Sequence, residues 1–157
     1  MLENNKEYQL ARSIVKLANT IIKNRNRHLQ ELDLTAGQAD SLQFFYPRQG
    51  AAITDLKEHL GITHQTARGI VQRLEAKGLV LLQKSDKDAR FQQIFLTSAG
   101  QQTVQILHNS GIRTGHKLLY QMTEAEQEIF TRLLNKAAAN LNQATAIPME
   151  QAEEKGV

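Results

Sequence analysis

The feature that most constrains the fold of this chain is a run of short elements between residues 53 and 100. A segment at 55–60 is followed, after only the tripeptide Gly-Ile-Thr, by a second segment at 64–77. Thr54 and Thr63 can cap these segments, because a threonine hydroxyl accepts a hydrogen bond from the first helical turn. A glycine follows each segment, as is common after a helix C terminus. Two helices joined by so tight a turn form a helix-turn-helix.

Two β-prone runs follow the second helix, at 79–84 and 90–96, and they flank a polar turn. Thr97 then caps a helix that we predict to run through about residue 119. A helix-turn-helix followed by a β-hairpin and a further helix is a winged helix-turn-helix. The predicted fold class is therefore mostly α with a small β-wing.

Helices are also predicted on both sides of this lobe. The segment 5–31 repeats apolar residues at helical spacing, and its apolar stripe is wider than one packing face needs. Thr35 can cap a helix at 36–46, and Thr123 with Glu126 forms a capping box that starts the last helix. We therefore expect the first helix to contact more than one partner surface, and the first and last helices together to carry more apolar surface than one small lobe can bury.

The overall composition excludes several classes of protein. The chain has no cysteine, which removes disulfides, thiol redox sensing and thiolate metal sites, and fits a reducing cytoplasm. No apolar run of signal-peptide or membrane-spanning type is present. Residues 62–97 carry six basic and three acidic side chains, whereas 121–157 carry three basic and six acidic ones. A positive middle region suits a polyanion partner such as duplex DNA, although ordinary surface solvation is the alternative.

The second helix of the pair, 64–77, separates cleanly into two faces on a helical wheel. Its inward face is apolar, and its outward face holds glutamine, arginine and small residues with no acidic side chain. Arginine reads guanine edges and glutamine reads adenine edges in the major groove. A solvated surface face is the competing interpretation. The residues that we predict to contact DNA from this helix are Thr63, Gln65, Thr66, Arg68, Gly69, Gln72 and Arg73.

The hairpin adds further basic residues. Lys84, Lys87 and Arg90 can contact the minor groove or the adjacent backbone. Asp88 is predicted to order the wing, either by holding Arg90 or by accepting backbone hydrogen bonds in the turn. A simple turn without any role in DNA binding is the alternative for this aspartate.

Taken with these residues, the chain resembles the MarR family of transcriptional regulators over essentially its whole length. The most specific stretches are LTAGQADSLQFF, HLGITHQTARGIVQRLEAKGLV, the D-x-R wing at 88–90, and LTSAG at 96–100. The resemblance implies a homodimer with interleaved terminal helices, and recognition helices in successive major grooves of a palindrome. It also implies a repressor that small aromatic or phenolic ligands release from DNA.

Three positions depart from the family pattern: Gly69, Leu82 and Ala89 stand where a polar or basic side chain is usual. They weaken the expected electrostatics of the DNA-binding face. A winged-helix module that binds another protein through a weakened DNA face is therefore the alternative function.

The resemblance also suggests a division of the chain and an effector site. The division is 1–34 for an N-terminal dimerisation helix, 35–99 for the DNA-binding lobe, 100–147 for C-terminal dimerisation helices and 148–157 for a frayed tail. The effector pocket is expected among 5–31, 36–46 and 98–119. The residues expected to line this pocket are Tyr46, Arg113 and His116.

Catalytic and metal chemistry finds little support in the sequence. No nucleophile elbow, phosphate-binding loop or zinc-protease motif is present, so we expect no enzyme activity and no cofactor. The five histidines are read as scattered surface residues without zinc-site spacing. A metal site built across subunits from His28, Glu31, His108 or His116 stays open as an alternative.

Overall fold

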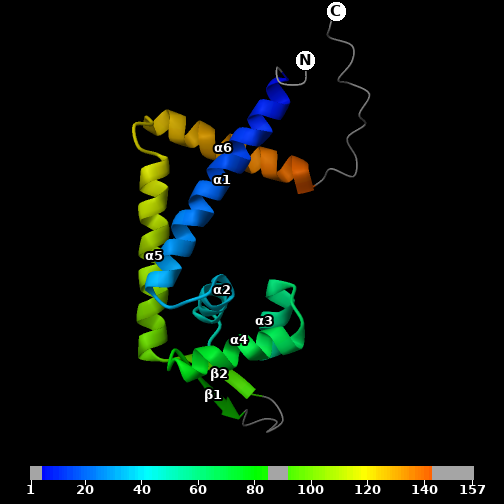
Figure 1. Cartoon of the computed structure of the whole chain (residues 1–157), viewed down its shortest axis with the longest axis vertical. Coiled ribbons are helices and arrows are strands. Elements are labelled where there is room, and N and C mark those ends of the chain that lie inside the picture. The colour runs from blue at the N-terminus through cyan, green and yellow to red at the C-terminus, as the bar shows by residue number, and fades with distance from the viewer. Residues whose placement is uncertain (1–4, 85–91, 143–157) are drawn as a thin grey trace, which may run out of the picture. The chain divides into compact units, whose positions relative to one another are not determined.

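A computed structural model of the chain describes residues 5–84 and 92–142. The chain divides into two compact units, Met1–Thr114 and Gly115–Val157. The helices and strands, in chain order (Figure 1), are α1 (Lys6–Glu31), α2 (Ala36–Phe45), α3 (Ile53–Leu60), α4 (His64–Ala76), β1 (Val80–Lys84), β2 (Gln92–Leu96), α5 (Ser98–Leu118) and α6 (Glu124–Asn142). These elements confirm the predicted mostly helical class with a small β-wing, and the predicted boundaries differ by one or two residues at most ends.

Threonine caps begin four of the helices, as the sequence predicts. Thr35 forms a capping box with Gln38, and Thr63 accepts a hydrogen bond from the Thr66 N–H at 3.1 Å. The Thr97 hydroxyl accepts the Gly100 N–H at 3.1 Å at the start of α5. In the second unit, Thr123 and Glu126 form the capping box that starts α6. The Thr123 N–H donates to the Glu126 carboxylate, and the Glu126 N–H donates to the Thr123 hydroxyl.

The predicted cap of α3 is wrong. Thr54 lies inside the first turn of this helix, which begins at Ile53 with Ala52 as its N-cap residue. The Ala52 N–H donates to the Asp55 carboxylate at 2.8 Å. The aspartate side chain satisfies this N–H, and Ile53 packs partly buried against the core, so the helix begins two residues earlier than predicted.

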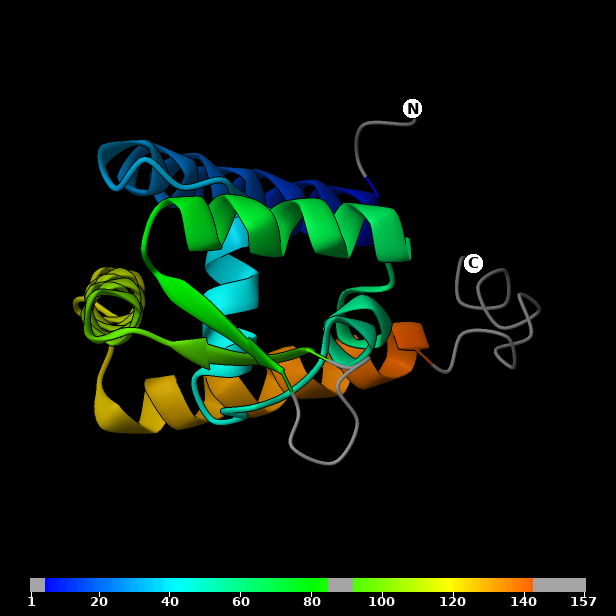
Figure 2. The same cartoon turned by 90° about the horizontal axis from the view of Figure 1, so that it is seen from below.

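One hydrophobic core holds the first unit together. Its fully buried side chains include Phe45 from α2, Leu56 from α3, Leu74 from α4 and Ile94 from β2. The hairpin is antiparallel, with Val80 opposite Leu96 and Lys84 opposite Gln92. Together, α4 and the hairpin lie at one end of the unit (Figure 1), and Figure 2 views this end from below.

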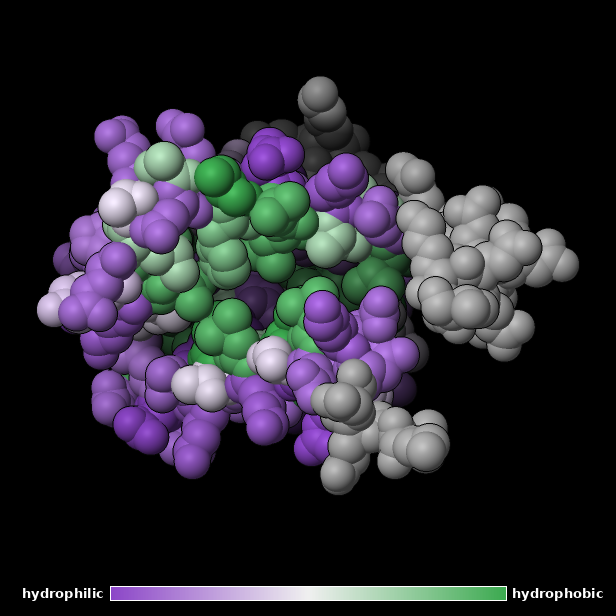
Figure 3. Space-filling model, turned by 90° about the horizontal axis from the view of Figure 1, so that it is seen from above, coloured by the Kyte–Doolittle hydropathy of each residue, from purple (hydrophilic) through white to green (hydrophobic). Residues whose placement is uncertain are grey.

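The terminal helices remain largely outside this core. Of the described residues of α1, only Leu29 is buried, and α6 has no buried residue. Figure 3 shows apolar side chains, drawn in green, at the surface. The large apolar residues exposed on α1 and α6 are Tyr8, Leu10, Ile14, Val15, Leu17, Ile22, Ile129, Leu133, Leu134 and Leu141. The prediction that these helices carry more apolar surface than a single chain buries is confirmed.

No helix in the described ranges 5–84 and 92–142 has the length and apolar character needed to cross a membrane.

Candidate nucleic-acid interface

The α4 helix has the two faces that the sequence predicts. Ala67, Ile70, Val71 and Leu74 are buried and fix this helix to the core. The opposite face is turned to solvent, with Gly69 half-buried along it. The predicted contact residues that the structure places there, all exposed, are Thr63, Gln65, Thr66, Arg68, Gln72 and Arg73.

The N terminus of α4 is organised by two threonines. The hydroxyls of Thr63 and Thr66 lie 2.8 Å apart, and the Thr66 N–H donates to the Thr63 hydroxyl. This cap leaves the positive end of the helix dipole facing outward, next to Gln65. A helix N terminus of this kind favours a phosphate group.

The cations of this face form no ion pair with the described part of the lobe. Within the described residues, the ion pairs are Arg25 with Asp40, His28 with Glu31 and Lys77 with Asp33. None of these pairs involves Arg68, Arg73 or Lys84. Their charges are therefore available to an external anion.

The structure explains one of the three departures from the family pattern, Leu82. Leu82 is half-buried and packs against the core cluster, so this side chain stabilises the hairpin. Gly69 has an ordinary helical backbone, and a Cβ atom built there meets no other atom within 4 Å. The fold therefore does not need a glycine at this position. The third departure, Ala89, lies outside the described residues.

Only the base of the wing is described. Lys84 is exposed at the end of β1, where it pairs with Gln92. The predicted contacts Lys87 and Arg90, and the predicted wing-ordering Asp88, lie outside the described residues.

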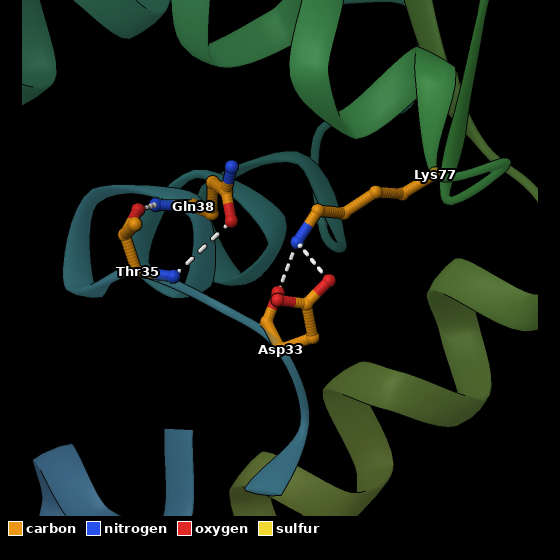
Figure 4. A network of polar contacts seen from close by, with 4 residues as sticks. All are labelled: Asp33, Thr35, Gln38 and Lys77. Atoms are coloured by element: carbon orange, nitrogen blue, oxygen red, sulfur yellow. Dashed lines mark hydrogen bonds and ion pairs between the residues drawn. The ribbon is translucent and has the colours of Figure 1, made fainter. Parts of the chain in front are cut away.

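Two positioning features escaped the sequence analysis. A Cβ atom on Gly100 would lie 2.0 Å from the Leu79 carbonyl oxygen, so only glycine lets the start of α5 approach the end of α4 this closely. In addition, the Lys77 ammonium contacts both the carboxylate and the backbone carbonyl of Asp33, next to the capping box at the start of α2 (Figure 4). The sequence shows Lys77 and Asp33 only as charges that are 44 residues apart.

An open groove of about 830 Å³ lies between the end of α2 and the middle of α5. The residues that line it are Gln43, Tyr46, Pro47, Val104, Gln105, Leu107, His108, Gly111 and Ile112. Of the three predicted effector contacts, Tyr46 lies in this lining, whereas Arg113 and His116 are exposed and do not belong to it. The predicted pocket also included the first helix, but no lining residue comes from α1.

The histidines do not assemble into a metal site within the described part of the chain, where no three His, Asp or Glu side chains come together. The His28 Nδ1 atom lies 3.3 Å from a Glu31 carboxylate oxygen. The His59 ring stacks on Phe44 with ring centres 4.7 Å apart, which is a packing role. A site shared between two subunits stays an untested alternative.

Comparison with known proteins finds similarity to HTH-type transcriptional regulators. The model of the MarR family matches residues 32–90. An HTH-type transcriptional regulator of Bacillus subtilis, YybA, is 24% identical over 84% of this chain and 88% of its own length. A second regulator of that organism, YwaE, is 31% identical over 55% of this chain and 51% of its own length.

Solved structures share the fold. A mutant of Staphylococcus aureus MepR superposes with a TM-score of 0.76 at 23% identity, covering 87% of this chain and 98% of that one. A putative MarR family regulator from Listeria monocytogenes, complexed with a 26mer DNA, gives a TM-score of 0.65 at 26% identity over 85% of this chain and 89% of that one. The winged-helix lobe is thus similar to the MarR family model over residues 32–90, and the chain shares its fold with these solved structures.

Proposed function

We propose that this chain is a DNA-binding transcriptional regulator that places α4 in the major groove of duplex DNA. The observation that carries this proposal is the outward face of α4, which is polar, free of acidic side chains and bears Arg68 and Arg73 without an ion pair to any described residue. The Listeria monocytogenes relative is complexed with DNA, and a MepR mutant at 25% identity is bound to an oligodeoxyribonucleotide. The match of residues 32–90 to the MarR family model supports membership of that family, and with it the expectation that the chain is not an enzyme.

Within this proposal the residues have separate tasks. Gln65, Arg68 and Gln72 contact base edges, because the first turns of a recognition helix reach deepest into the groove. Gly69 lies between them and allows the backbone to come close. The residues that contact the phosphate backbone are Thr63, Thr66, Arg73, Lys84, Lys87 and Arg90. Asp88, which like Lys87 and Arg90 lies outside the described residues, keeps in this proposal the wing-ordering role that the sequence predicts.

We also propose that the chain acts as a homodimer on a palindromic operator. Apolar side chains such as Leu10, Ile14 and Leu133 are 45–62% exposed, and a large exposed apolar surface usually marks an interface. A two-fold dimer would hold the two α4 helices roughly 34–36 Å apart, which matches one turn of B-form DNA.

A small molecule that occupies the groove between α2 and α5 is proposed to release the repressor from its operator in the cytoplasm. The lining combines apolar Val104 and Ile112 with polar Tyr46 and His108, and includes no lysine, arginine, aspartate or glutamate. This chemistry fits an uncharged aromatic ligand that accepts and donates hydrogen bonds. The predicted contacts Arg113 and His116 remain part of the proposal as residues of the same helix beyond this lining.

A mobility-shift assay on genomic fragments at stated salt concentrations tests DNA binding. We expect retarded bands that weaken steeply as salt increases, because the contacts are largely with phosphates. Absence of any shift at low salt would favour the alternative, a winged-helix module that binds another protein. The packing of Leu82 against the core weakens that alternative, because this departure from the family pattern then has a structural reason.

Solution mass tests the dimer separately, with Leu133→Glu as the disrupting variant. We expect twice the chain mass for the unmodified protein and a single chain for the variant. A single-chain mass for the unmodified protein would refute the dimer.

For the effector, a thermal-shift screen of uncharged aromatic compounds should give hits that Ile112→Trp abolishes by filling the groove.

A further inference from the structure

The C terminus of α1 ends in an unusual cap. The Leu34 N–H donates to the Leu29 carbonyl at 2.8 Å, and the Asp33 N–H donates to the Gln30 carbonyl at 3.0 Å. These two bonds form a Schellman motif, in which the residue after the cap adopts a left-handed conformation. Glycine usually occupies that position, but here it is Asp33, with a φ of 52°. A side chain in this conformation carries a steric cost that glycine avoids.

The C terminus of α4 ends in the same motif. The Gly78 N–H donates to Glu75 at 2.8 Å, the Leu79 N–H donates to Leu74 at 3.0 Å, and Gly78 has a φ of 69°. The cap residue of this helix is Lys77. Its ammonium donates to the Asp33 carboxylate at 2.9 Å and also to the Asp33 backbone carbonyl (Figure 4). The cap residue of α4 thus binds the capping turn of α1.

The two side chains of this ion pair differ in their exposure to solvent. The Lys77 side chain is 30% exposed, whereas that of Asp33 is 96% exposed. A lysine at this place also faces the negative ends of two helix dipoles, which favours a cation. The contact therefore stabilises a junction between the two helix ends and leaves the carboxylate in water.

This junction connects two helices with different proposed tasks. The α4 helix is the proposed DNA-reading element, and α1 carries the exposed apolar surface proposed for dimerisation. Within the described residues, Lys77 makes the side-chain hydrogen bonds that join the end of α4 to the turn after α1. A change in this contact would alter how α4 is held relative to α1.

We propose that Asp33 and Lys77 are a positioning pair that fixes α4 relative to α1 and thereby raises the affinity for DNA. The inference rests on the proposed DNA binding by α4. Neither residue lies among the predicted base or phosphate contacts of the helix face.

Simple electrostatics predicts the opposite outcome for loss of Asp33. Removing a carboxylate from a DNA-binding lobe makes the lobe more positive, which strengthens binding to a polyanion. The positioning role predicts weaker binding in spite of the added positive charge. The sign of the change in affinity therefore separates the two explanations.

The test compares Asp33→Gly, Asp33→Asn and the charge control Glu58→Gln. Glycine suits the left-handed conformation, so Asp33→Gly should keep or raise the melting temperature while it removes the carboxylate part of the contact and leaves the bond to the backbone carbonyl. We expect its dissociation constant for operator DNA to rise roughly three-fold, the scale of one exposed ion pair. Asp33→Asn keeps an oxygen acceptor and should fall between Asp33→Gly and the unmodified chain. Glu58→Gln should bind as tightly as the unmodified chain, or more tightly.

The proposal is overturned if Asp33→Gly binds DNA as tightly as the unmodified chain or more tightly. It is also overturned if affinity falls only together with the melting temperature, since that pattern indicates a purely structural role. If the unmodified chain binds no DNA, the proposed function fails, and amide hydrogen exchange still tests the junction. Asp33→Gly should then speed exchange at Gly78 and Leu79, and unchanged rates at both amides would refute the junction.

Discussion

Replacing Gly69 by alanine is expected to stabilise the fold and to weaken DNA binding at the same time. A Cβ atom at this position meets nothing within 4 Å, and the backbone is in the ordinary helical region. Alanine is more favourable than glycine inside a helix by about 1 kcal/mol. For a chain of this size, that gain raises the melting temperature by about 2–4 °C. The added methyl group, however, projects from the face that we propose to enter the groove.

The loss of DNA affinity should be on the scale of one mismatched base pair, about 1 kcal/mol or more, or roughly five-fold. Gly115→Ala is the matched control, because that glycine is also helical and has an open Cβ position, but lies on α5 outside the groove lining. It should show the same thermal gain with unchanged affinity. Thermal melts and fluorescence-anisotropy titrations at one salt concentration measure both quantities. Unchanged affinity in Gly69→Ala would refute the close approach of this helix face, and a lower melting temperature would refute the stability argument.

Three further outcomes are expected. Gly100→Ala should destabilise the lobe by about 2 kcal/mol or more in a denaturant titration, because its Cβ would lie 2.0 Å from a backbone carbonyl oxygen. The hydrogen bonds that Thr123 donates, first from its backbone N–H and then from its hydroxyl, hold the pKa of Glu126 below its ordinary value. The stability that this carboxylate adds to α6 is therefore present above its unfolded pKa and lost as the pH falls through the lowered pKa, and Thr123→Ala should move the NMR-titrated pKa back up. Arg68→Ala should relax base preference at one operator position, whereas Lys84→Ala should weaken binding to all sequences and flatten the salt dependence, as mobility shifts on operator variants would show.

Local chemistry explains why so much of the fold was predictable. The spacing of apolar residues in α4 placed Ile70 and Leu74 on the buried face, and the structure confirms that face. Threonine caps at Thr63 and Thr97 mark helix starts, because the hydrogen bond that they accept lies within three residues of sequence. The cap of α3 was mispredicted because its N-cap residue, Ala52, has no side chain that marks the position, and the Asp55 carboxylate accepts the Ala52 N–H instead.

The candidate site was predictable only in part. Helical periodicity predicts which residues of α4 lie on its outward face. Arg68 and Gln72 were placed there from the sequence, and both are exposed in the structure. The groove was less predictable, because it forms where α2 and α5 meet, which placed His108 and Ile112 in the lining instead of Arg113 and His116. Sequence spacing along one helix does not reveal which residues face another helix.

The sequence by itself determined the order of the elements, the four threonine caps and the polar face of the recognition helix, since these depend on interactions between near neighbours in the chain. The tertiary structure alone decided that Gly100 must be glycine, that Leu82 serves the core, and that Lys77 binds the turn at Asp33. Each of these depends on atoms brought together from distant parts of the chain. Such contacts arise from how elements pack, and no local pattern of residues encodes them.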